Sequence, residues 1–140
     1  MKYRKELLLE LRPNIKGVKT NMNTKEIESF QNYVLRPILK FQNELLLESF
    51  MNHARQHKDV FFKLPAPQQK NYIYQSVNTN QKFRSKLIVM VIALFTIEEY
   101  RYYILNLSAL NKRIISMLIQ RLESQLNELN DVISVEISRE

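Results

Sequence analysis

Residues 87–97 form an uncharged run, L-I-V-M-V-I-A-L-F-T-I, in which no helical face is polar. A surface helix keeps a polar stripe, so a helix that is apolar all round must be enclosed by protein or lipid. The eleven residues rise about 1.5 Å each and span roughly 16 Å, well short of the roughly 30 Å hydrocarbon core of a bilayer. The run therefore predicts a central helix inside a bundle or at a subunit interface, and no membrane span.

Apolar residues with helical spacing flank this run on both sides. The pattern N-x-x-E at residues 23–26 is typical of a helix start, and the apolar row that follows reaches about residue 57. Pro37 lies inside that row and lacks an amide donor, so we expect a kink or a break near residues 35–36. Beyond a loop at residues 64–67, the pattern predicts helices over about 67–77, about 80–105, and from Asn106 or Ser108 to about 130.

These elements predict an all-α fold, a single-domain bundle of four to five helices around a central all-apolar helix. Residues 1–22 lack a clean period and are expected to form an irregular N-terminal arm, while residues 23–140 form the bundle domain. Within residues 1–12 and 132–137 the pattern fits a strand as well as a helix, so both alternatives stay open there.

The composition excludes several classes of enzyme. The chain has one glycine, Gly17, so neither a P-loop nor a Rossmann phosphate-binding motif can be written. It has no cysteine, which excludes disulfides, thiolate catalysis and cysteine-based zinc sites, and suits a reducing compartment. Glu6 and Glu10 interrupt the leucines near the N-terminus, so no signal peptide is recognised and we expect a cytoplasmic protein. The sequence predicts no cofactor.

Positive charge suggests a polyanion as one partner. The formal net charge is +7; residues 1–70 carry 13 basic and 7 acidic side chains, and residues 71–140 carry 8 and 7. Such a charge attracts nucleic acid, although a solvated basic surface explains it more simply. Lys82, Arg84 and Lys86 fall in the first turns of the 80–105 helix, where the helix dipole disfavours cations. They are therefore a candidate anion-binding site, with a solvated rim around Phe83 as the alternative.

Two histidines and two glutamates form a candidate metal site. His53 and His57 are four residues apart, so they share one helical face, but Ala54 replaces the glutamate of an H-E-x-x-H motif. Carboxylates would have to come from Glu98 or Glu99, whose burial would raise their pKa and suit them to acid–base work. The alternatives are histidines that stabilise a helix C-terminus and glutamates that mark where a core helix meets solvent.

Association through apolar side chains is the leading functional hypothesis. A chain of 140 residues has few helices with which to cover an all-apolar one, and large uncovered patches usually mark association. We therefore expect a non-enzymatic interaction module that forms a homodimer or binds a helical partner. A polyanion-binding protein is the second hypothesis, and a metal-dependent enzyme is the third. The expected interface side chains are Val89, Ile92, Phe95, Leu118 and Leu122.

Four segments carry a resemblance to a known family. They are F-Q-N-Y-V-L-R-P-I-L-K-F-Q-N-E-L-L-L at 30–47, Q-K-F-R-S-K-L-I at 81–88, F-T-I-E-E-Y at 95–100 and S-A-L-N-K-R at 108–113. The chain resembles a family of small uncharacterised bacterial helical proteins, some of which carry the name glyoxalase. The resemblance covers most of residues 28–126 and implies no functional residues. The glyoxalase name is disfavoured, because the H-x-H-x-D-H motif and the metal-bearing strands of glyoxalases are absent.

Overall fold

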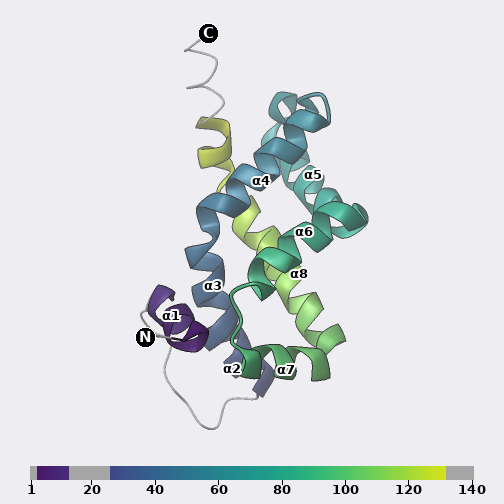
Figure 1. Cartoon of the computed structure of the whole chain (residues 1–140). Helices are drawn as coiled ribbons and strands as arrows, with labels where there is room; N and C mark the ends of the chain where they lie inside the picture. The colour runs from purple at the N-terminus through teal and green to yellow at the C-terminus, as the bar shows by residue number, and fades with distance from the viewer. Residues whose placement is uncertain (1–2, 13–25, 132–140) are drawn as a thin grey trace. The chain divides into compact units, whose positions relative to one another are not determined.

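The chain is all-α over residues 3–12 and 26–131, which are the residues that the computed structural model describes (Figure 1). No strand occurs within these ranges, so the predicted fold class is confirmed. The helices in chain order are α1 (Arg4–Leu11), α2 (Glu26–Phe30), the π-helix η1 (Gln31–Leu35), α3 (Arg36–Phe41), α4 (Asn43–Gln56), the 3₁₀-helix η2 (Val60–Lys63), α5 (Ala66–Thr79), α6 (Gln81–Ile92), α7 (Ile97–Leu105) and α8 (Leu107–Glu123). Residues 126–131 are helical as well.

None of the helices in the described ranges is long and apolar enough to cross a membrane. This finding agrees with the length of the 87–97 run.

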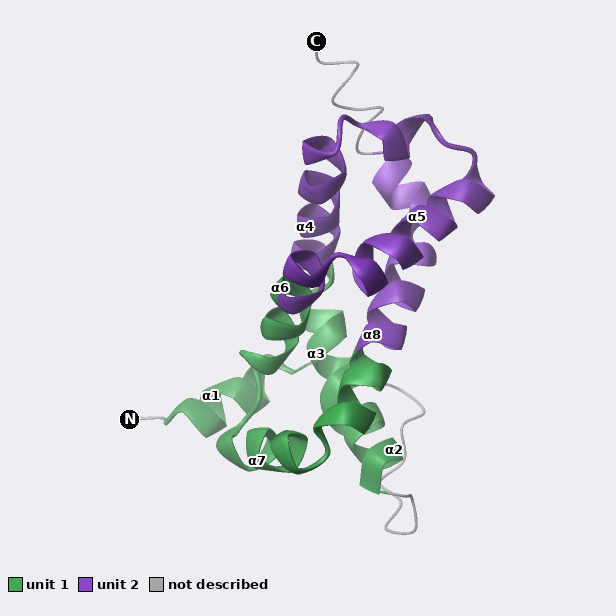
Figure 2. Cartoon of the chain, turned by 90° about the vertical axis from the view of Figure 1, so that its right-hand side faces the viewer, with its two compact units in different colours: residues 1–43, 86–114 green, residues 44–85, 115–140 purple. Residues whose placement is uncertain are grey.

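The chain divides into two compact units, each assembled from two separate stretches of sequence (Figure 2). Unit 1 comprises residues 1–43 and 86–114, and unit 2 comprises residues 44–85 and 115–140. All three boundaries fall inside helices, namely the first turn of α4 and the interiors of α6 and α8. Boundaries between separate domains usually fall in exposed linkers, so uninterrupted helices at these points are what a single domain predicts.

The helix predicted over residues 80–105 is interrupted, and that prediction was wrong. α6 ends at Ile92 and α7 begins at Ile97. The hydroxyl of Thr96 accepts a hydrogen bond from the Glu99 amide at 3.2 Å, and the Glu99 carboxylate accepts one from the Thr96 amide at 2.8 Å. This reciprocal capping box begins α7. The run is also not enclosed on every side, because Val89 is 60% exposed whereas Leu87 and Val91 are fully buried.

Pro37 disturbs the helix where the sequence predicts, although the chain is not broken there. η1 ends at Leu35, and the Arg36 amide donates to the carbonyl of Gln31, five residues back. Pro37 follows within the first turn of α3, where its missing amide is tolerated. The widened π-helical turn is therefore the form that the expected kink takes.

The N-terminal arm is helical where the structure describes it. α1 begins with the Tyr3 amide donating to the Glu6 carboxylate at 2.5 Å, and only Leu8 of this helix is buried. The periodic signal is weak because the neighbouring leucines are exposed. The expected boundary between residues 22 and 23, the expected cap at Asn23 and residues 132–137 lie outside the described residues.

Aromatic side chains form the centre of each unit. In unit 1, the ring of Phe95 packs edge-on against Phe30 at 5.5 Å and against Tyr103 at 5.7 Å. In unit 2, Phe50 packs edge-on against Phe61 at 4.9 Å, and both are fully buried. Burial of one such ring contributes about 1.5–3 kcal/mol, so these contacts anchor the helices that carry the candidate sites.

Candidate functional site

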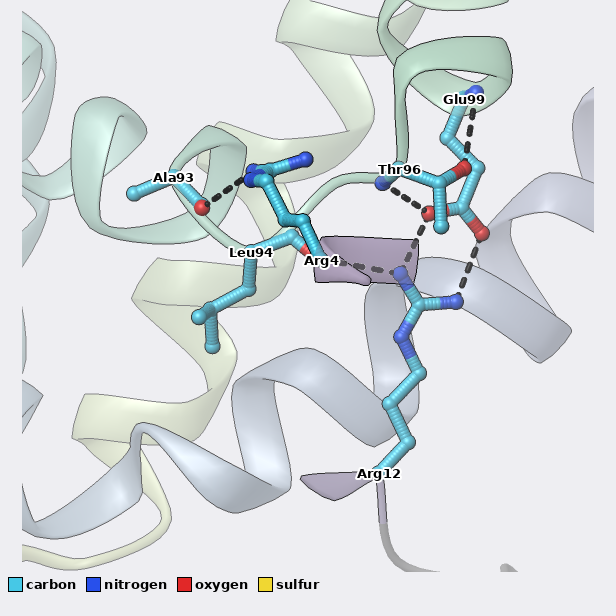
Figure 3. A network of polar contacts seen from close by, with 6 residues as sticks. All are labelled: Arg4, Arg12, Ala93, Leu94, Thr96 and Glu99. Atoms are coloured by element: carbon cyan, nitrogen blue, oxygen red, sulfur yellow. Dashed lines mark hydrogen bonds and ion pairs between the residues drawn. The ribbon is translucent and has the colours of Figure 1, made fainter. Parts of the chain in front are cut away.

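Arg12 joins the end of α1 to the interruption between α6 and α7 (Figure 3). Its Nη1 donates to Glu99 Oε2 at 2.6 Å, its Nη2 donates to Glu99 Oε1, and Nη2 also donates to the carbonyl of Leu94 at 3.1 Å. Arg4 Nη2 donates to the carbonyl of Ala93 at 3.0 Å. Arg4 of α1 and Arg12 at its C-terminal end therefore bind the carbonyls of the two residues that follow α6.

The Glu99 carboxylate is ionised and fully engaged. Burial alone would raise the pKa of Glu99, but hydrogen bonds from Arg12 and from the Thr96 amide outweigh burial and hold the pKa below its usual range. The sequence raised the opposite expectation, a raised pKa suited to acid–base work. Both oxygens of Glu99 accept charge-assisted or amide hydrogen bonds, so this carboxylate is a structural anchor.

Glu98 has a different environment from its neighbour. It is exposed, and its nearest cation is Lys5 of α1, with a 3.6 Å ion pair. The pKa of Glu98 is lowered by its hydrogen bond to the backbone and then by Lys5. An exposed pair at this distance is worth little, so Glu98 contributes charge to the surface of unit 1.

The two histidines lie together at the end of α4 in unit 2. His53 is 7% exposed and stacks on the ring of Phe83, with centroids 4.1 Å apart and planes 13° from parallel. His57 Nδ1 donates to the carbonyl of His53 at 2.7 Å, and the imidazole centroids are 4.3 Å apart. Glu98 and Glu99 belong to unit 1. Over residues 3–12 and 26–131, no group of three or more histidines and carboxylates is arranged to hold a metal ion.

The three candidate anion-binding cations have different surroundings. Arg84 is half-buried, and its Nη1 donates to the carbonyl of Asn78 at 3.2 Å. Asn80 Oδ1 accepts from the Phe83 amide at 3.1 Å, so a side chain already occupies part of the α6 N-terminus. Lys82 and Lys86 are exposed. Only these two lysines therefore present free charge to an anion along this helix.

The five expected interface side chains also differ in how much of their surface is exposed. Val89 is well exposed and Ile92 is half-buried, but Phe95, Leu118 and Leu122 are at most 1% exposed within the single chain. A side chain without exposed surface cannot contact a second copy of the chain unless its own copy changes conformation. These three residues belong to the core, which leaves Val89 as the expected residue that is most available to a partner.

A different apolar surface, which the sequence did not reveal, lies on α7 and the start of α8. The inner side of α7 is fixed by Tyr103, which is buried and whose hydroxyl donates to Asn111 Oδ1 at 2.5 Å. Its outer side carries large apolar side chains that are between 44% and 83% exposed. We call this set the α7 face: Ile97, Tyr100, Ile104, Leu105 and Leu107. Reading Thr96–Glu99 as a helix start would have revealed the i, i+3, i+7 row of Ile97, Tyr100 and Ile104.

No family model, curated protein or solved structure matches this chain. The family resemblance noted from the sequence therefore stays a prediction, and the functional argument depends on the geometry of the chain itself.

Proposed function

We propose that this chain is a non-enzymatic helical interaction module that self-associates through the α7 face. The observation that carries the proposal is the set of five exposed apolar side chains within residues 97–107 of unit 1. Residues 3–11 of the same unit carry a second exposed set, Tyr3, Leu7, Leu9 and Leu11. Among the described residues of unit 2, by contrast, the large exposed hydrophobic residues are Leu45, Val60 and Tyr74, one each on α4, η2 and α5. Scattered apolar residues are normal on a protein surface, whereas a contiguous patch is typical of an interface.

The size of the α7 face supports a weak association. Its five side chains, which are between 44% and 83% exposed, leave on the order of 500 Å² of apolar surface per copy. Two copies would then bury about 1,000 Å², which is at the lower end of specific interfaces. We therefore expect a concentration-dependent dimer and not an obligate one.

The order of residues along α7 favours a second copy as the partner. Ile97 and Ile104 lie two turns apart on either side of Tyr100 and Arg101. In an antiparallel pair with its two-fold axis near residue 100, each Ile97 would pack against Ile104 of the other copy. Arg101, which is exposed, would then lie near the Tyr100 ring of the other copy, a favourable cation–π geometry.

Sedimentation velocity over a concentration series tests this proposal. Ile104→Glu should shift the protein to monomer at every concentration, because two buried charges would face an apolar surface. The matched control is Leu45→Glu on α4, since Leu45 and Ile104 have nearly equal exposure, 49% and 47%. A wild-type protein that stays monomeric at millimolar concentration would refute the proposal, as would equal dissociation of both variants.

Polyanion binding is the alternative, and it has less support. Lys82 and Lys86 are exposed one turn apart on α6, but Arg84 and the α6 N-terminus already have partners within the chain. If nucleic acid does bind there, affinity should fall steeply with salt, because phosphate contacts release counterions. Lys82→Ala/Lys86→Ala should then weaken binding and reduce that salt dependence.

A further inference from the structure

One carboxylate joins α1 to the start of the helix that carries the α7 face (Figure 3). Thr96 immediately precedes α7, and Ile97 is both the first residue of α7 and the first residue of the α7 face. The Glu99 carboxylate accepts from the Thr96 amide at 2.8 Å and from Arg12 Nη1 at 2.6 Å. The cap that precedes Ile97 and the end of α1 therefore share one side chain.

α1 also holds the connection between α6 and α7, residues 93–96. Arg4 Nη2 donates to the Ala93 carbonyl at 3.0 Å, and Arg12 Nη2 donates to the Leu94 carbonyl at 3.1 Å. The amides of residues 93–95 donate to carbonyls of α6. α6 and α1 together therefore fix the path that the chain takes into α7.

The attachment of α1 to unit 1 is mostly polar. Leu8 is the one buried residue of this helix, and Leu7, Leu9 and Leu11 are 45–47% exposed. Detachment of α1 therefore requires less free energy than unfolding of the whole unit. When α1 detaches, Glu99 loses its cation, and the carbonyls of residues 93 and 94 lose the hydrogen bonds from Arg4 and Arg12.

We propose that α1 regulates the self-association through the α7 face, and that its attachment to unit 1 strengthens dimer formation. This role rests on the proposed function. With α1 attached, residues 93–97 are held in place before a second copy binds. Without α1, these residues have to become ordered as the second copy binds, which weakens the association. Coupling between two sites is reciprocal, so dimer formation holds α1 in place by the same factor.

α1 acts on the α7 face without covering it. Successive residues of a helix are turned by about 100°, so Glu99 lies on a different side of α7 from Ile97, Tyr100 and Ile104. The residues of the α7 face are between 44% and 83% exposed with α1 in place. This geometry favours an α1 that supports the face over one that masks the face and has to be displaced.

Replacement of Arg12 tests the coupling in one direction. Coupling between sites commonly changes an affinity by about 5- to 150-fold, and α1 adds order to the α7 face but no contact surface. We therefore expect a dimer dissociation constant about five- to tenfold higher for Arg12→Met in sedimentation velocity over a concentration series. Asn130→Ala is the control for lost stability, because it removes a 3.0 Å hydrogen bond to Gln69 in unit 2, which carries no part of the α7 face. Its dissociation constant should equal that of wild type.

A second measurement tests the opposite direction and does not depend on whether Arg12→Met folds. The chain has no cysteine, so Leu8→Cys introduces a single thiol at the buried position of α1. An excess of iodoacetamide should label this thiol only while α1 is detached. Labelling should slow by about five- to tenfold at concentrations where sedimentation shows this variant to be dimeric. Leu9→Cys is the matched control, because Leu9 is 47% exposed on the same helix, and its labelling rate should not change.

The possible results distinguish regulation by α1 from self-association itself. A wild-type chain that stays monomeric at millimolar concentration would refute both. If wild type dimerises, a dissociation constant for Arg12→Met that equals the value for wild type or for Asn130→Ala would refute the role of α1 alone. An unchanged labelling rate of Leu8→Cys on dimer formation would do the same, and faster labelling would show that α1 masks the α7 face.

Discussion

Arg12 and Glu99 are 87 positions apart in the sequence, and both carboxylate oxygens of Glu99 accept hydrogen bonds from the Arg12 guanidinium (Figure 3). The side chains are only 11% and 16% exposed. The same carboxylate accepts from the Thr96 amide at the start of α7. One glutamate therefore both caps α7 and holds the end of α1 in place.

Replacing Arg12 should destabilise the protein substantially. Arg12→Met leaves the Glu99 carboxylate largely buried without its cation, which should lower the free energy of unfolding by about 2–4 kcal/mol. Urea denaturation at pH 7 measures the change. Lys5→Met is the control, because Lys5 and Glu98 are well exposed, and it should leave the free energy of unfolding nearly unchanged. Similar losses in the two variants would show that the pairing of Arg12 has no special role.

The pH dependence of stability should carry the signature of Glu99. The pKa of Glu99 is lower in the folded state than in the unfolded state, so its stabilisation is fully present above the unfolded pKa of about 4.3. The stabilisation is lost as pH falls through the folded pKa. The difference in unfolding free energy between wild type and Glu99→Gln should therefore shrink between pH 6 and pH 3, roughly, in denaturation curves. A constant difference across this range would contradict the assignment.

Thr96 should matter because it begins α7. Thr96→Ala removes the hydroxyl that accepts from the Glu99 amide, and should cost about 1 kcal/mol. Thr96→Ser keeps an acceptor and should recover most of that loss. Thr79→Ala is a matched control, because the Thr79 hydroxyl donates to the Gln75 carbonyl inside α5 and caps no amide. Thermal unfolding of the three variants ranks them, and equal effects at both threonines would argue against the cap.

A buried amide pair should hold residues 126–131 in unit 2. Gln69 Nε2 donates to Asn130 Oδ1 at 3.0 Å, and Asn130 Nδ2 donates back to Gln69 Oε1 at 3.2 Å. Asn130→Ala leaves Oε1 of the buried Gln69 without its hydrogen-bond donor, while Gln69 Nε2 keeps its bond to the Phe61 carbonyl, and should cost about 1–2 kcal/mol. Asn127→Ala is the exposed control and should be nearly neutral.

Local patterns in the sequence predicted which segments are helical better than they predicted where each helix begins and ends. The spacing of apolar residues identified the segments that become α4, α5, α6 and α8, and Pro37 marked the π-helical turn. The T-x-x-E capping signal at Thr96 was available, but the uniform apolar character of residues 87–97 suggested that the helix continued through it. Periodicity alone cannot distinguish one buried helix from the end of one and the start of the next.

Contacts between distant segments could not be predicted from one sequence. Nothing local to Arg12 indicates that it meets Glu99, and Glu99 itself was considered a candidate acid or metal ligand. Likewise, no short pattern brings Glu128 beside Glu48 or places His53 on the ring of Phe83. Each of these pairs depends on the packing of helices that are separated in the chain, which sequence periodicity does not specify.

The sparse packing of α1 has a consequence for how the protein opens. This helix buries a single leucine, and polar contacts of Arg4, Lys5 and Arg12 also attach it to unit 1. Segments with few buried apolar contacts exchange their amide hydrogens through local opening, at a free energy below that of global unfolding. The amides of α1 should therefore exchange with deuterium well before those of α4, and acid or salt should widen that gap. α1 would then behave as a separate foldon, whose release requires the Arg12–Glu99 ion pair and its weaker polar contacts to break.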